Sequence, residues 1–148
     1  MKVALDAMGG DNAPAEIVKG ALQALNLYPE IEKIFLVGKE EEIEKFITVK
    51  NEKIEIVNAR EVIEMDDHPA LAYRRKKDAS ITVATKLVKE KEADAIISAG
   101  NTGGQMTSSL FILGRIKGIS RPAIATPLLV MKGITLFLDS GAIADCTV

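Results

Sequence analysis

The chain has 148 residues, of which 47% are hydrophobic and 27% charged, and its formal net charge is −2 at pH 7. These values are typical of one globular domain with a buried core, and they argue against a nucleic-acid-binding surface, which needs a basic excess. One cysteine, Cys146, and one histidine, His68, exclude an internal disulfide and argue against a zinc site. We therefore expect no metal and no cofactor. The chain shows no signal peptide and no apolar run of membrane-spanning length, so we expect a cytoplasmic protein.

Apolar runs suited to buried strands alternate with helical patterns along most of the chain. Strands are expected at residues 2–6, 33–37, 53–57 and 94–97. Helices are expected between them, ending near Tyr28, in the charged segment after Gly38, and at residues 79–92. Their inner faces are predicted to carry Val18, Ala21, Leu22, Leu25, Ile43, Phe46, Ile47, Ile81, Ala84 and Val88. The alternation predicts a three-layer α/β/α fold with a mostly parallel sheet, as a single α/β domain over residues 1–148.

The pattern loosens between residues 58 and 77, and loop statistics favour a connecting loop there. This segment ends in a basic run formed by Arg74, Arg75, Lys76 and Lys77. One interpretation is a solvated helix end, because positive charges suit the C-terminal dipole of a helix. The other is a docking patch for an acidic partner, because a basic cluster raises encounter rates through long-range attraction.

The last third of the chain is expected to add a helix and two strands. Met106, Leu110 and Leu113 recur at helical spacing and predict an amphipathic helix that stops near Gly114. Apolar runs at residues 123–130 and 134–138 follow a turn. These two strands are expected to be neighbours joined as a hairpin, which would add antiparallel pairing to a mostly parallel sheet.

Three of the expected strands end in small and hydrogen-bonding residues, at residues 5–11 (LDAMGGD), 98–104 (SAGNTGG) and 138–142 (LDSGA). In an open α/β sheet, loops at the carboxyl ends of the strands converge on a ligand. The loop at residues 98–104 leads into a helix, whose unpaired N–H groups and positive dipole end suit an anion. The alternative is a set of simple caps and turns, above all for Asp6, Asp11 and Asp139. Neither a dinucleotide fingerprint nor a P-loop is present, which argues against a nicotinamide-dependent dehydrogenase and a nucleotide hydrolase.

Long motifs stand at residues 5–11, 98–103 and 114–123 (GRIKGISRPA), with further runs at 61–64 and 74–77. Taken in this order, they resemble the bacterial phosphate acyltransferase (PlsX) family. The resemblance implies transfer of a long-chain fatty acyl group from acyl carrier protein to inorganic phosphate, giving acyl phosphate for phospholipid synthesis. It also implies a fold similar to phosphotransacetylase and isocitrate dehydrogenase, a homodimer, and peripheral association of the full-length protein with the membrane.

The resemblance suggests roles for particular residues. Asn101 and Asp139 are expected to be catalytic, with Asn101 among the donors that stabilise an oxyanion. The basic run is expected to bind the acidic acyl carrier protein. Phosphate or substrate binding is expected of Asp6, Gly9, Gly10, Asp11, Ser98, Gly100, Asn101, Thr102 and Gly103.

Two departures from the family pattern limit these expectations. The family's chain continues far beyond the length seen here, so the resemblance is to its N-terminal half, and we expect this chain alone to be weak or inactive. Ile143 stands where the family has an asparagine, and its side chain neither donates nor accepts hydrogen bonds. The alternative function is therefore a truncated or degenerate, non-catalytic copy that binds only phosphate or acyl carrier protein.

Overall fold

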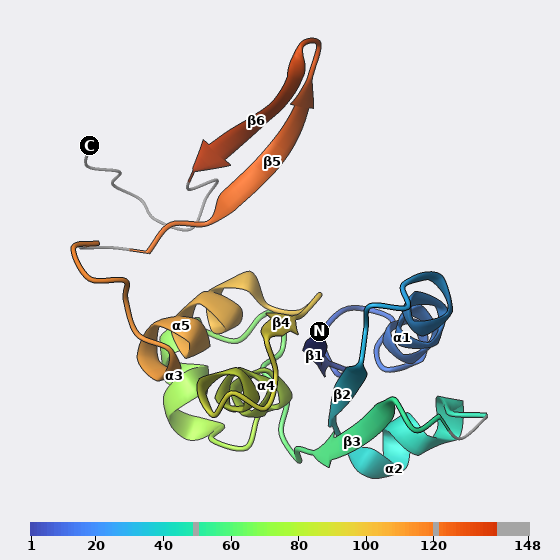
Figure 1. The fold of residues 1–148 in the computed structure, drawn as a ribbon. Helices are drawn as coiled ribbons and strands as arrows, with labels where there is room; N and C mark the ends of the chain where they lie inside the picture. Colours follow the sequence, from blue (N-terminus) through green and yellow to red (C-terminus); the bar gives the residue numbers. More distant parts are fainter. Residues whose placement is uncertain (49–50, 120–121, 139–148) are drawn as a thin grey trace. The chain divides into compact units, whose positions relative to one another are not determined.

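A computed structural model describes residues 1–48, 51–119 and 122–138 of the chain (Figure 1). Its contacts divide the chain into two compact units, one from Met1 to Gly114 and the other beginning at Arg115. Each unit is described by itself. The prediction of a single domain over residues 1–148 depends on how the two units are arranged, and it stays a prediction.

The first unit is built on a four-stranded parallel sheet in the order β3-β2-β1-β4. Its strands are β1 (Lys2–Asp6), β2 (Lys33–Gly38), β3 (Ile54–Asn58) and β4 (Ala95–Ile97). The chain moves outward from β1 through β2 to β3, and then returns to the other side of β1 to form β4. The direction of winding therefore reverses between β1 and β4.

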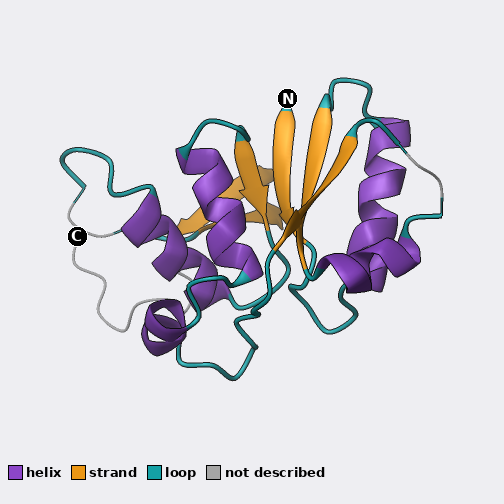
Figure 2. Ribbon diagram, turned by 90° about the horizontal axis from the view of Figure 1, so that it is seen from below, coloured by secondary structure: helices purple, strands orange, loops and turns teal. Residues whose placement is uncertain are grey.

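Helices cover both faces of this sheet, which confirms the predicted α/β/α layers (Figure 2). One face carries α1 (Ala15–Leu27), α2 (Glu40–Ile43) and the short 3-10 helix η1 (Glu44–Phe46). The other carries α4 (Ser80–Lys89), with α3 (Pro69–Arg75) and α5 (Thr102–Ile112) packed beside it. Part of the charged segment after Gly38 is 3-10 rather than α-helix.

Alternation along β2 shows how one strand serves both layers. Ile34 and Leu36 point toward α1, while Phe35 and Val37 point toward α4, because successive side chains of a strand face opposite ways. All four are buried. A central strand buried on both sides reads as a continuous apolar run, which is how residues 33–37 were identified in the sequence.

Three local predictions were wrong. Helix α3 lies inside the segment that was expected to be a connecting loop. Phe46 was placed on an inner face but is 41% exposed, at the end of η1. In α5 the buried residues are Gly104, Thr107 and Ser108 rather than the predicted apolar face. The cause is the close packing of α5 on α4, where Thr82 Oγ1 and Ser108 Oγ lie 3.4 Å apart and small side chains fit best.

The described part of the second unit contains the antiparallel hairpin of β5 (Ala125–Val130) and β6 (Gly133–Leu138). Ala125 lies opposite Leu138, and Val130 lies opposite Gly133. The predicted hairpin is thus confirmed, but it forms a two-stranded sheet of its own, so the expectation that it adds antiparallel pairing to the parallel sheet was wrong. Across the residues that the structure describes, no helix combines the length and the apolar character needed to span a membrane.

Candidate functional site

The loops after β1 and β4 lie side by side at the carboxyl edge of the sheet. Parallel sheets bind ligands where the winding direction reverses, because the two loops there turn away from each other and leave a crevice. Ser98 Oγ donates a 2.7 Å hydrogen bond to Asp6 Oδ2, and the N–H of Gly100 donates to Ser98 Oγ at 3.1 Å. Asp6 is only 3% exposed, and its other oxygen accepts from the N–H of Met8 at 3.2 Å. Asp6 therefore joins the two loops.

Gly9 allows this close approach of the two loops. A Cβ atom at Gly9 would lie 2.7 Å from Asp6 Oδ2 and 2.8 Å from both the backbone nitrogen of Gly100 and Ser98 Oγ. Real Cβ atoms essentially never come so close to other heavy atoms, so any side chain would push the loops apart. Gly10 and Asp11 continue the turn, with Asp11 exposed.

The first turn of α5 offers backbone donors next to this junction. Asn101 is the N-cap, and its Oδ1 accepts the N–H of Gly104 at 2.8 Å. The N–H groups of Thr102 and Gly103 have no acceptor within the described ranges. Two unpaired N–H groups at the positive end of a helix are suited to an anion such as phosphate.

The side chain of Asn101 is already engaged within the protein. Its Nδ2 donates to the carbonyl oxygens of Glu64, Met65 and Asp67 at 2.9, 3.3 and 3.3 Å. The residue is 7% exposed. In this arrangement both amide hydrogens are used to hold a neighbouring loop, so the structure assigns Asn101 a structural role, while its role as an oxyanion donor stays a prediction.

The basic run divides into different environments. Lys76 donates to the carboxylate of Asp67 and to the carbonyl oxygen of Val62 at 2.8 Å. The hydrogen bond from the Lys76 ammonium holds the pKa of Asp67 below its ordinary value. Lys77 Nζ lies 4.3 Å from the centre of the Tyr73 ring. Arg74 and Arg75 are exposed in the last turn of α3, so the helix-end interpretation holds and the docking patch stays a prediction.

The third strand-end loop and its predicted residues lie outside the described ranges. They include Asp139, the second predicted catalytic residue, together with Ile143 and Cys146. The structure therefore brings together the loops after β1 and β4, and the convergence of the loop after β6 stays a prediction.

The whole chain, residues 1–148, matches the model of a family described as "Fatty acid synthesis protein". The chain belongs to this family. It is 57% identical over 147 residues to a phosphate acyltransferase of Desulfitobacterium hafniense strain DCB-2, 55% over 148 residues to one of Pelotomaculum thermopropionicum, and 54% over 150 residues to one of Dictyoglomus turgidum. These matches cover 98–99% of this chain and 43–44% of the relatives. The chain thus spans less than half the length of the curated relatives it matches, and the resemblance found in the sequence is confirmed.

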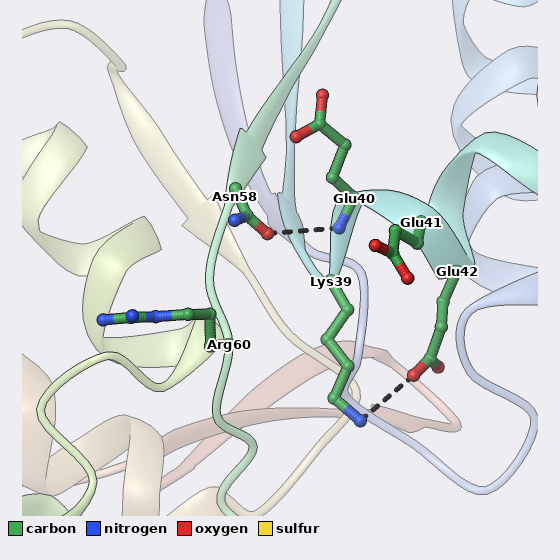
Figure 3. Close-up of a pocket in the computed structure, with 6 residues that line it drawn as sticks. All are labelled: Lys39, Glu40, Glu41, Glu42, Asn58 and Arg60. Carbon is green, nitrogen blue, oxygen red and sulfur yellow. Dashed lines mark hydrogen bonds and ion pairs between the residues drawn. The ribbon is translucent and has the colours of Figure 1, made fainter.

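This member of the fatty acid synthesis family has a hollow at the carboxyl ends of β2 and β3 (Figure 3). Its volume is about 370 Å³. Its charges are largely paired, because Lys39 bonds to Glu42 at 3.1 Å and Arg60 bonds to Asp78 at 2.7 Å. Three glutamates, Glu40–Glu42, also line it and would repel an anion. We therefore place the candidate anion site at the β1–β4 junction rather than here.

The sequence did not predict the contacts of the Glu64–Asp67 turn, the turn at residues 64–67 that the N–H of Asp67 closes by donating to the carbonyl oxygen of Glu64. Residues 58–77 show no helical or strand periodicity, so the acidic residues of the turn did not indicate that it packs on Asn101. One signal was available: an asparagine directly before a helix is a common N-cap. Its amide nitrogen would then be free to hold another segment, which is what the Asn101 side chain does.

Proposed function

We propose that this chain forms the phosphate-binding half of an acyltransferase that moves a long-chain fatty acyl group from acyl carrier protein to inorganic phosphate. The product would be an acyl phosphate for phospholipid synthesis. The observation that carries the proposal is the junction of the β1 and β4 loops beside the unpaired N–H groups of Thr102 and Gly103. The relatives named phosphate acyltransferase support it.

The proposed reaction needs no nucleophile from the protein. A phosphate oxygen attacks the thioester carbonyl carbon, and a C–O bond forms through a tetrahedral oxyanion. The C–S bond then breaks, and the carrier's sulfur leaves as a thiolate that takes up the proton lost by the phosphate. The protein's task is to hold phosphate beside the carbonyl and to stabilise the oxyanion. Thr102 and Gly103 would hold phosphate by their N–H groups. Asp6, as a carboxylate, is a poor phosphate ligand because like charges repel, so its part is to fix the loops through Ser98.

The acidic acyl carrier protein is proposed to dock on the basic end of α3. Arg74 and Arg75 are exposed there and suit its negative surface. The proposal extends to the whole protein as a cytoplasmic homodimer that associates peripherally with the membrane. Asp139 keeps its proposed catalytic role in this scheme.

Binding and turnover test the proposal separately. Calorimetry with inorganic phosphate and with long-chain acyl carrier protein should show that the chain binds both. A product assay for acyl phosphate then distinguishes an enzyme from the second candidate, a non-catalytic copy. That candidate is favoured by Ile143, which stands where the family it resembles has an asparagine. Binding without turnover, even after the remaining half of a relative is supplied, would favour it. Failure to bind either ligand would contradict both functions.

A further inference from the structure

The Glu64–Asp67 turn, defined by the hydrogen bond from the N–H of Asp67 to the carbonyl oxygen of Glu64 at 3.2 Å, is held by Lys76. The Lys76 ammonium donates to Asp67 Oδ2, and the same oxygen accepts the N–H of Glu64 at 2.8 Å. Lys76 also donates to the carbonyl oxygen of Val62, two residues before the turn. The side chains of Lys76 and Asp67 are 30% and 27% exposed. Charge-assisted hydrogen bonds in such partly buried places are stronger than those in open water.

The same turn is bound on its other side by Asn101. Three of its carbonyl oxygens accept hydrogen bonds from Asn101 Nδ2, and Asn101 Oδ1 accepts the N–H of Gly104. A continuous path of hydrogen bonds therefore runs from Lys76 through Asp67 and the turn to the first turn of α5. Each link restricts the next, because the Asn101 amide keeps its orientation only while the carbonyls stay in place.

A direct packing contact lies beside this path. Pro69, the first residue of α3, packs on Gly103 so closely that a Cβ at Gly103 would lie 2.5 Å from Pro69 Cγ. The start of α3 therefore touches the very turn of α5 that carries the unpaired N–H groups. The two contacts are independent, since one is a hydrogen-bonded path and the other is steric.

We propose that Lys76 and Asp67 are positioning residues that set the geometry of the anion-binding turn of α5 through the Glu64–Asp67 turn and Asn101. They touch no substrate themselves. The consequence for phosphate rests on the proposed function, whereas the coupling between Lys76 and α5 stands on the contacts alone. Lys76 is thus set apart from its neighbours in the basic run, because its ammonium already has two acceptors while Arg75 is exposed.

The first test compares Lys76→Met with Arg75→Met in the ligand-free chain. Both changes remove one positive charge from the same run, so they are matched in charge. Amide hydrogen exchange by NMR should speed up about tenfold at Gly104 in Lys76→Met. The change removes the charge-assisted bond that holds the Glu64–Asp67 turn, and this turn holds Asn101, whose Oδ1 accepts the N–H of Gly104. Exchange at Gly104 should stay unchanged in Arg75→Met. Lys76→Arg keeps a donor to Asp67 and should restore slow exchange.

Exchange at Leu36 separates local from global effects. Leu36 lies in the central strand β2 and is fully buried, so its amide reports the stability of the whole unit. Faster exchange at Gly104 with unchanged exchange at Leu36 supports the coupling. Equal acceleration at both amides, or none at Gly104, would overturn it.

The second test measures binding by calorimetry. Lys76→Met should weaken the affinity for inorganic phosphate about tenfold and leave the affinity for acyl carrier protein unchanged. Arg75→Met should weaken the affinity for acyl carrier protein and leave the affinity for inorganic phosphate unchanged. Equal loss of carrier-protein affinity in both variants, with unchanged phosphate affinity, would make Lys76 a docking residue and overturn the proposal. If the unaltered chain binds no phosphate, the proposed function fails, and the exchange at Gly104 still decides the coupling.

Discussion

The α1 layer of the first unit and helix α5 on its other face are held in different ways. On the α1 face, Val18 of α1 and Ile43 of α2 are fully buried in one apolar cluster with Leu36 of the sheet. On the other face, α5 buries only Gly104, Thr107 and Ser108, and its first turn is held by the hydrogen bonds of Asn101. The α1 layer is thus stabilised mainly by apolar burial, whereas the turn that carries the candidate site is held by polar bonds and close backbone contacts.

The largest expected effect comes from the apolar layer. Leu36→Ala should lower the free energy of unfolding by about 2–5 kcal/mol, because it removes buried methyl groups and leaves a cavity. The matched control is Leu27→Ala, at a residue that is 70% exposed in the last turn of α1. Chemical denaturation of both variants measures the difference. Similar losses in the two would contradict the account of this layer.

Gly9→Ala probes the loop junction and should cost about 1–3 kcal/mol of stability, because the new Cβ overpacks the space between Asp6 and Gly100. Phosphate affinity should fall with it. Gly20→Ala is the control, since nothing lies within 4 Å of its Cβ position on α1. That change should stabilise the chain by about 0.5–1 kcal/mol. Thermal unfolding of the two variants should show a lower melting temperature for Gly9→Ala and a higher one for Gly20→Ala. An unchanged melting temperature in Gly9→Ala would show that the loops do not need their close approach.

Asn101→Ala removes a helix cap and should cost about 1–2 kcal/mol. Asn101→Asp keeps an oxygen for the N–H of Gly104 but loses the donors to the Glu64–Asp67 turn. Amide exchange should therefore speed up at Asp67 in both variants, because its N–H closes the turn, and at Gly104 in both, but more in the alanine variant, which has also lost the acceptor of the Gly104 N–H. If the aspartate variant leaves exchange at Asp67 unchanged, the amide nitrogen of Asn101 is not what holds the turn.

The smallest effect concerns the ion pair of Arg60 and Asp78. The hydrogen bond from Arg60 holds the pKa of Asp78 below its ordinary value. The pair therefore stabilises the fold above the ordinary range of aspartate, near pH 4, and this contribution is lost as the pH falls through the lowered pKa. Melting temperatures of Arg60→Gln and the unaltered chain should differ slightly at neutral pH, because the pair is exposed to solvent, and should converge in acid. A difference that grows in acid would contradict the assignment.

The contrast between the α1 layer and α5 also explains what could be predicted from the sequence. The strands and α1 were predicted because apolar burial leaves a period in the residues, as in the run at 33–37. The meeting of the loops after β1 and β4 was predicted, because small residues after a strand are typical of such a site, but the hydrogen bond between Asp6 and Ser98 was not. The buried face of α5 was not predicted, because Thr107 and Ser108 carry little apolar signal. Neither was the link from Lys76 to Asn101, because it reaches Asn101 through backbone carbonyls, which no side-chain pattern reports.

The central claim is that the first turn of α5 binds phosphate, and the most direct test is a titration of the ¹⁵N-labelled chain with inorganic phosphate. The account predicts saturable NMR shifts that are largest at the amides of Thr102 and Gly103, with smaller shifts at Gly100. Amides on the hollow lined by Lys39 and Arg60 should not respond. The absence of saturable shifts at Thr102 and Gly103, or a stronger response at the hollow lined by Lys39 and Arg60, would contradict the account.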